Sequence, residues 1–290
     1  PTKGSSTTLK FAFGSCTKHD DQPIFGPILS YNPDLFLFVG DNHYANSDDL
    51  NALRQYYRWA HERPQRSTMM SSVPILAIWD DHDFVGNNTD GSEAGKDVAL
   101  RAFKEYWANP SYGTDVTPGV FFQTSYGDID FFAIDDRYWR GLDDSVLGDE
   151  QEAWLLSQLK ASMAVFKFIV SGSQFTSHGS GDSWAAFPAA HERLLQHIVD
   201  ESITGVVFLS GDVHRSEFRS VAAVSGGYDI PELSSSPMAN SNSSCSSDSE
   251  LRECFDSDDY FIGVEVNTTA ADPTVKAQLF DRNGELQAVW

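Results

Sequence analysis

Basic residues are scarce in this chain of 290 residues, because 20 Lys and Arg stand against 42 Asp and Glu, a formal net charge of −22. A field of this sign repels nucleic acid and anionic membrane surfaces, so neither is expected as a stable partner. No apolar run approaches the ~20 residues that span a bilayer, so no transmembrane segment is expected. The chain opens at Pro1 without a methionine. We therefore expect a removed leader and a secreted or periplasmic protein.

Cysteine is also scarce, with three residues in the chain. Cys245 and Cys254 flank the loop "CSSDSELREC" and could close a small disulfide loop, which would imply an oxidising compartment. Cys16 is left over, and a lone cysteine is most often an inert buried side chain. Its role depends on what lies near it.

No Gly/Pro-rich linker interrupts the sequence, which predicts a single domain over residues 1–290. Apolar runs predict strands at 9–13, 35–39, 73–78, 131–134, 166–170 and 206–209. Amphipathic patterns predict helices at 48–61, 93–107 with Ser92 as N-cap, 148–162 and 188–199. This alternation predicts a largely parallel sheet with helices on its faces. After about residue 215 we expect antiparallel strands in "EFRSVAAV", "YFIGVEVN", "TVKAQLFD" and "ELQAVW", the last two joined by a "DRNG" turn.

Four of the predicted strands end in a cluster of polar residues. The clusters comprise Ser15 and Cys16; Asp41, His43 and Tyr44; Asp80, Asp81, His82 and Asp83; and Asp212 and His214. Each cluster alone is typical of a turn or a solvated acidic loop. Ligands bind beyond the carboxyl ends of the strands of an open parallel sheet, and four adjacent strands would bring all four clusters to one edge. The repeated placement therefore predicts one site.

The residue types in these clusters indicate metal chemistry. Crowded carboxylates repel one another unless cations neutralise them. Carboxylates prefer hard ions such as calcium, whereas thiolate, phenolate and imidazole suit a transition metal. Because both donor sets are present, we expect two unlike metals sharing one carboxylate. Two metals about 3.5–4 Å apart form the clamp that cleaves phosphate esters.

Several motifs, in their order along the chain, resemble one known family. They are "FAFGSC", "FVGDNHY", "IWDDHDFVGNN", "IDDRYW", "LGDEQEAWLLSQL", "SGSQ", "LSGDVH" and "ELSSSP". Together they resemble the PhoD-like alkaline phosphatases and phosphodiesterases, a branch of the calcineurin-like metallophosphoesterase superfamily. The resemblance implies an α/β fold, a four-layer αββα sandwich of two mixed sheets. It also implies Fe³⁺ and Ca²⁺ as cofactors and a small phosphate ester, monoester or diester, as substrate.

The resemblance also implies roles for individual residues. Cys16, Asp41, Tyr44 and His214 would bind the ferric ion, Asp41 would bridge, and Asp81 and Asp212 would bind the second metal. His82 would be the catalytic histidine, with Arg137, Asn87 and Asn88 contacting substrate. Arg137 could equally pair with Asp135 or Asp136, and Gln174 or His178 is a further candidate for lining the site.

A second class of function also fits the acidic composition. The chain could be a secreted calcium-binding or adhesion module on a degenerate phosphatase scaffold, which would suit the Ser/Asp-rich loop. Every expected metal ligand is present, and this favours the enzyme. The sequence does not decide between monoesters and diesters, and it leaves the oligomeric state open.

Overall fold

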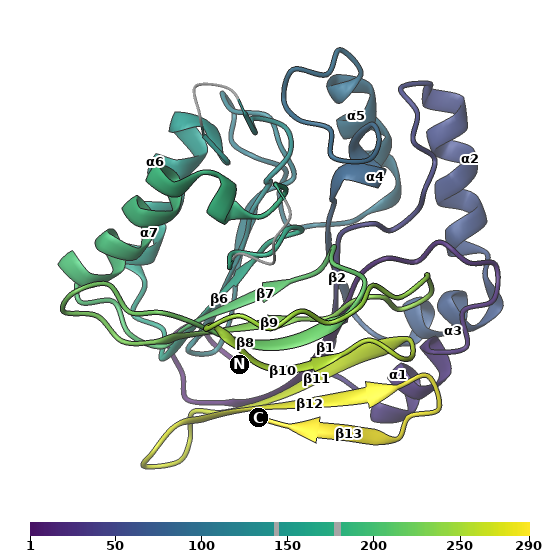
Figure 1. The fold of residues 1–290 in the computed structure, drawn as a ribbon. Helices are drawn as coiled ribbons and strands as arrows, with labels where there is room; N and C mark the ends of the chain where they lie inside the picture. The colour runs from purple at the N-terminus through teal and green to yellow at the C-terminus, as the bar shows by residue number, and fades with distance from the viewer. Residues whose placement is uncertain (142–144, 177–180) are drawn as a thin grey trace.

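Two β-sheets stack face to face, and helices cover their outer faces (Figure 1). The computed structural model describes residues 1–141, 145–176 and 181–290. The first sheet has six strands in the order β13-β12-β11-β1-β2-β3, and the second has seven in the order β10-β8-β9-β7-β6-β5-β4. This arrangement is the predicted four-layer αββα sandwich.

The six-stranded sheet contains β1 (Thr8–Gly14), β2 (Leu35–Val39), β3 (Ile75–Ile78), β11 (Tyr260–Asn267), β12 (Thr274–Asp281) and β13 (Leu286–Val289). The seven-stranded sheet contains β4 (Phe122–Tyr126), β5 (Ile129–Ala133), β6 (Phe166–Val170), β7 (Val206–Ser210), β8 (Ser216–Val221), β9 (Ile230–Ser234) and β10 (Leu251–Phe255). The helices are α1 (Phe25–Tyr31), α2 (Leu50–His61), α3 (Pro64–Ser72), α4 (Asp81–Phe84), α5 (Lys96–Tyr106), α6 (Gly148–Ala161), η2 (Trp184–Ala186) and α7 (Pro188–Asp200).

The strands after residue 215 do not form a separate antiparallel half. β8 and β10 join the seven-stranded sheet, whereas β11, β12 and β13 extend the six-stranded one. The pairs formed by β8, β10, β11, β12 and β13 are antiparallel, but β9 pairs in parallel with β7. β4, β9 and β10 were not among the predicted strands.

The predicted start of the helix over 93–107, with Ser92 as its N-cap, was wrong. The helix predicted from 93 begins at Lys96, after Gly95. Ser92 does not cap it, because both its amide and its hydroxyl donate to Asp90 Oδ1, at 2.9 and 2.6 Å. The acidic motif after β3 begins the short helix α4, and Asp80 and Asp83 cap this helix with reciprocal side-chain-to-backbone bonds.

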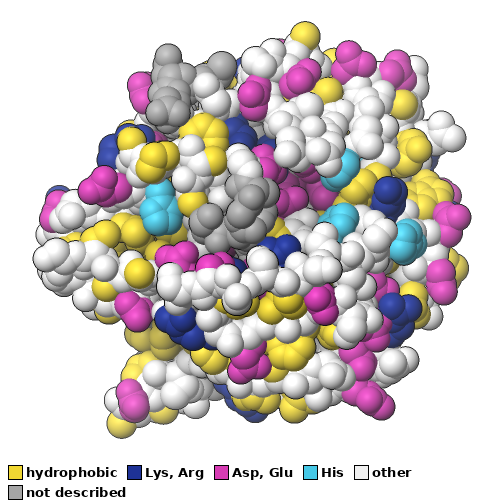
Figure 2. Space-filling model, viewed as in Figure 1, with side chains coloured by type: hydrophobic (Ala, Val, Ile, Leu, Met, Phe, Trp, Pro, Cys, Tyr) yellow, Lys and Arg dark blue, Asp and Glu magenta, His cyan; other side chains and the backbone are white. Residues whose placement is uncertain are grey.

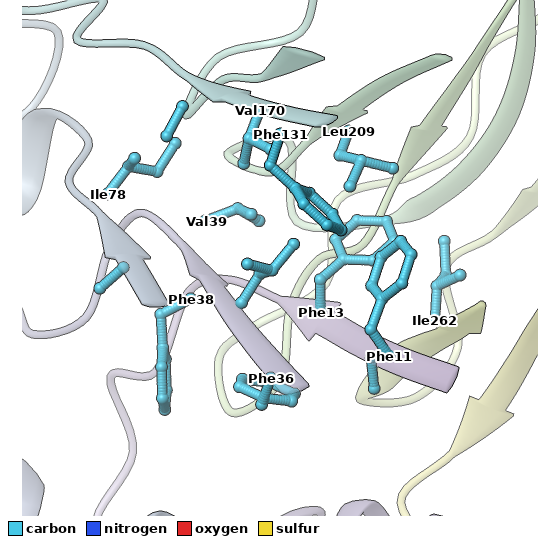
Figure 3. Packing of buried hydrophobic residues seen from close by; sticks show 14 of the residues in the cluster. Phe11, Phe13, Phe36, Phe38, Val39, Ile78, Phe131, Val170, Leu209 and Ile262 are labelled. Carbon is cyan, nitrogen blue, oxygen red and sulfur yellow. The ribbon is translucent and has the colours of Figure 1, made fainter. Parts of the chain in front are cut away.

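The main hydrophobic core lies between the two sheets. Figure 3 shows Phe11 and Phe13 of β1 beside Phe131 and Leu209, which come from the opposite sheet. Phe11 meets Phe131 edge-on, with ring centroids 5.3 Å apart. A second cluster packs α6 and α7 against the outer face of the seven-stranded sheet. Among the described residues no helix is long and apolar enough to cross a membrane.

The two sheets are in direct contact where β1 and β7 end. The Ser15 amide donates to the Ser235 carbonyl at 3.1 Å, which ties the β1 loop to the opposite sheet. A Cβ on Gly211 would lie 2.4 Å from Ser15 Oγ, so only glycine fits there. This close approach brings the polar loops of both sheets to one edge.

Candidate metal centre

Loops from both sheets supply the predicted ligands. β1, β2 and β3 lie side by side in parallel and deliver Cys16, Asp41 and Asp81 to one edge. β7 belongs to the other sheet and delivers Asp212 and His214. The expectation of four adjacent strands was therefore wrong, yet the clusters meet because the ends of the two sheets converge.

The ligand-bearing backbone is unusually strained. Cys16, Asp41, Asp212 and His214 all have left-handed backbone, with φ of 63°, 52°, 66° and 55°. This region costs energy for residues with a Cβ, and such residues concentrate at functional sites. Each strand thus ends in a sharp turn that directs a polar side chain toward the shared edge.

One donor set joins a thiol, a carboxylate, a phenol and an imidazole. Cys16 Sγ lies 3.4 Å from Asp41 Oδ2, and the Tyr44 hydroxyl donates to the same oxygen at 2.8 Å. The Tyr44 oxygen lies 3.2 Å from His214 Nε2. The four residues predicted to bind the ferric ion therefore converge.

Asp41 also belongs to a second donor set. Its other carboxylate oxygen, Oδ1, accepts the His82 backbone amide at 3.3 Å. Ligand atoms of Asp41, Asp81 and His82 lie within 4.8 Å of one another, as do those of Asp80, Asp81 and Asp212. Asp81 and Asp212, the predicted second pair of ligands, are thus together beside Asp41.

Burial makes this cluster costly without cations. Burial raises the pKa of the Cys16 thiol to about 12 and that of Asp212 to about 8, and it raises the pKa of Asp41 well above its usual range. Burial also raises the pKa of Asp81, but the Arg137 guanidinium and His82 outweigh this effect and lower it. Most of these acids would therefore hold their protons unless positive charge were supplied.

The residues present fit two metal ions. The first set offers the thiol, phenol and imidazole that suit a transition metal, and the second offers carboxylates that suit a hard ion. Asp81 Oδ1 and Asp80 Oδ2 are buried and have no hydrogen-bond partner among the described residues. A buried carboxylate oxygen without a donor is what an absent cation would leave.

His82 lies above this cluster and is oriented by a neighbour. Its Nδ1 lies 2.5 Å from Asn46 Oδ1, its ring is 4.1 Å from the Tyr44 ring, and its Nε2 is 4.0 Å from Asp81 Oδ1. Because Asn46 Oδ1 can only accept, it holds the proton on Nδ1 and leaves Nε2 facing the cluster.

A polar pocket of about 380 Å³ lies over the cluster, lined by Asp41, His82, Asn87, Asn88, Asp182, Asp212, Val213, His214, Arg215 and Ser243. In Figure 2 a recess on this face has acidic side chains at its floor and histidines at its rim. The predicted substrate residues Asn87 and Asn88 are exposed at the pocket. The Asn88 amide also donates to Asp81 Oδ2 at 2.6 Å.

Arg137 is engaged entirely by the protein. It is fully buried, and its guanidinium does not bond to the Asp135 or Asp136 side chain, although its backbone amide donates to Asp135 Oδ1 at 3.0 Å. Nε donates to Asp80, and the two terminal nitrogens donate to Asp182, Ser173 Oγ and the Thr89 carbonyl. These bonds use all five donors of the guanidinium, so a direct substrate contact would require one of them to break.

Gln174 and His43 do not line the pocket. Gln174 is buried and donates to Glu217 and Ser234 at 2.8 and 2.7 Å. His178 lies outside the described residues. His43 is buried and packs edge-on against Tyr57 at 4.1 Å, away from the pocket.

The similarity of this chain to known proteins identifies its family. Residues 11–287 match the family described as PhoD-like phosphatase. The chain belongs to this family. Alkaline phosphatase D of Bacillus subtilis (strain 168) is 26% identical over 269 residues, covering 72% of this chain and 46% of the relative. The chain thus spans about half the length of that curated PhoD-like relative.

Solved structures of related phosphatases share the fold. A structure of PhoD superposes with a TM-score of 0.80 at 18% identity, covering 99% of this chain and 72% of the other. A purple acid phosphatase, PPD1 from yellow lupin (Lupinus luteus) seeds, gives 0.70 at 13% identity, covering 100% of this chain and 54% of the other. The predicted PhoD-like fold is confirmed.

Sequence reasoning missed three residues of this PhoD-like site. Asn46 orients His82, and Asp182 lines the pocket while it binds Arg137. Arg215 also lines the pocket, and its buried Nη2 has no hydrogen-bond partner among the described residues. Only Arg215 had a signal, since it directly follows the motif "GDVH".

Proposed function

We propose that this protein hydrolyses phosphate esters at a dinuclear centre that holds Fe³⁺ and Ca²⁺. The observation that carries the proposal is the placement of Asp41, which belongs to both donor sets. Oδ2 lies with the Cys16 thiol and the Tyr44 phenol, Oδ1 accepts the His82 backbone amide, and Asp41 groups with Asp81 and His82 as well as with Cys16 and His214. A carboxylate in this position is suited to bridge two unlike ions.

The assignment of the two ions follows from donor chemistry. Thiolate and phenolate favour Fe³⁺ at Cys16, Tyr44, His214 and Asp41, whereas carboxylates favour Ca²⁺ at Asp81 and at Asp212. When bound, the two ions would polarise the phosphoryl group and lower the pKa of a water molecule.

The protein's own side chains have separate roles in the proposal. His82, held by Asn46, faces the pocket and stabilises charge or transfers a proton at the leaving oxygen. Asn87 and Asn88 are placed to contact phosphate oxygens at the pocket. Arg215, whose Nη2 has no partner in the described part of the chain, is the arginine we expect to bind a phosphate oxygen in place of Arg137.

The test combines metal analysis with an activity assay on the same sample. We expect iron and calcium, a visible phenolate-to-iron charge-transfer band, and turnover of a mono- or a bis-aryl phosphate. Cys16→Ser should weaken the iron site, because a hydroxyl is a poor substitute for a thiolate. A colourless, iron-free and fully active enzyme would refute the iron assignment. Calcium binding without turnover of either ester would instead support the calcium-binding or adhesion module.

We also propose a secreted or periplasmic location. Cys245 and Cys254 form a disulfide, and structural disulfides persist in oxidising compartments. Fractionation of the source cells with an activity assay tests this location, and activity confined to the reducing cytosol would contradict it.

A further inference from the structure

A second cleft, of about 570 Å³, opens beside the metal pocket. Tyr56 and Trp59 of α2 and Lys18 of the loop after β1 line it, and Tyr44 forms the wall shared with the metal centre. We call this space the aromatic cleft. Because Tyr44 contacts both Asp41 and the His82 ring, the cleft begins where the metal pocket ends.

The aromatic wall of the cleft is partly fixed before any ligand binds. The Trp59 indole nitrogen donates to Asp20 Oδ1 at 3.1 Å, and the Arg63 guanidinium lies 4.9 Å from its ring centroid. Tyr56 stands beside it with ring centroids 6.3 Å apart, and 41% of its surface is exposed. A large exposed ring next to a fixed indole is a stacking surface, and its preorganisation lowers the entropy cost of binding.

Lys18 supplies positive charge at the junction of the two spaces. Its ammonium lies 5.5 Å from the Tyr44 ring centroid. Among the described residues Lys18 has no ion pair, whereas Arg137 is bound by Asp80 and Asp182. The chain has a net charge of −22, so the positive charge of Lys18 provides local electrostatic attraction for an anion that approaches the metals.

We propose that the aromatic cleft binds the alcohol portion of the substrate, and that this portion carries a flat aromatic ring, as in a nucleoside or aryl phosphate ester. The inference rests on the proposed function, because it places the phosphate at the metal centre. The ring stacks on Tyr56, while the Trp59 indole, inclined by 58° to the Tyr56 ring, contacts its edge, and Lys18 faces the phosphate. Every base or aryl ring has a π face, so we expect the cleft to favour esters that carry an aromatic ring without distinguishing between different rings.

Other alcohol portions fit the lining less well. An alkyl chain would lie against Lys18, Asp20 and the Gln55 side chain, which are polar. A small polyol would leave both rings without a stacking partner. If the substrate carried either of these alcohols, Tyr56→Ala would not reduce kcat/KM selectively for the adenosine ester.

The test compares adenosine 5′-phosphate with glycerol 3-phosphate, each also as its methyl diester. Both alcohols leave as primary alkoxides, so the two substrates differ mainly in the ring. For Tyr56→Ala we expect kcat/KM to fall roughly tenfold for the adenosine ester, the lower part of the range for one base–aromatic stack. The value for the glycerol ester should stay unchanged, and Tyr56→Phe should behave as the unaltered protein does.

Two further arms separate this proposal from the proposed function. Tyr126→Ala is the matched control. Tyr126 lies at the end of β4 and pairs with Ile129, the end of β5 opposite to Ala133. This variant should change kcat/KM for neither substrate. Calorimetry with adenosine 5′-phosphate and with inorganic phosphate reports binding even if no ester is hydrolysed. Selective loss of nucleotide binding in Tyr56→Ala supports the cleft. Equal affinity of variant and unaltered protein for the nucleotide, or equal losses for both probes, would overturn it.

Discussion

Replacing Arg137 with methionine should unfold the protein at a markedly lower temperature. The guanidinium is fully buried and forms a salt bridge with the Asp80 carboxylate, and it binds Asp182 Oδ2 at 2.7 Å. Methionine fills similar space but leaves Asp80 buried without its cation. Removing one partner of a buried ion pair costs about 3–5 kcal/mol. For a chain of this size that free energy corresponds to a fall in Tm of roughly 5–8 °C.

The pH dependence of this loss has a defined sign. Burial raises the pKa of Asp80 well above its usual range, and Arg137 partly offsets that rise. Without Arg137 the folded protein binds a proton at Asp80 over a wider range of pH than the unfolded chain does. Stability then falls as pH rises through that range, so the loss caused by Arg137→Met should be smaller at pH 5 than at pH 8.

Thermal unfolding followed by circular dichroism measures the effect, and two further variants control it. Asp80→Asn in the Arg137→Met background removes the orphaned charge and should recover part of the lost stability. Arg54→Met breaks a two-bond pair with Glu105 at the surface, where solvent screens it, and should change Tm little. An unchanged Tm for Arg137→Met together with a large loss of kcat/KM would refute this reasoning and restore Arg137 as a substrate contact.

Three further predictions concern the metal centre and the disulfide. Asp41→Asn should lose bound metal and activity together, because a bridging carboxylate offsets the repulsion between two ions; metal analysis that finds both ions retained would contradict the bridge. His82→Ala should keep its metals and lower kcat by about 10²–10⁴-fold, the range for a positioned acid–base group; an emptied metal centre would make His82 a ligand instead. Reducing Cys245–Cys254 should cost about 2–3 kcal/mol, as expected for a short loop, and leave the core folded. Mass analysis without reductant should find Cys16 as the free thiol of the chain, and Cys16 in a disulfide would refute that.

The sequence by itself determined the strands that carry the site and most of the donors. Runs such as 35–39 are apolar on both sides because each strand is buried between layers. A continuous apolar run can be recognised in the sequence before the fold is known. The polar residues directly follow each apolar run in the sequence, so they must lie at the end of the corresponding strand. The resemblance to the PhoD-like family then implied Cys16, Asp41, Tyr44 and His214 as one set, and the structure brings them together.

Only the tertiary structure decided which side chains meet across the two sheets. β7 supplies its ligands from the second sheet, and β9 joins β7 in parallel, because pairing depends on packing between distant segments. Arg137 had nearby Asp135 and Asp136 in sequence, yet it binds Asp80 and Asp182, which lie 57 and 45 residues away. A buried charge takes the partners that the fold presents to it, and those are not set by sequence distance. The aromatic cleft arises in the same way, since Lys18 and Tyr56 become neighbours only when α2 packs beside the loop after β1.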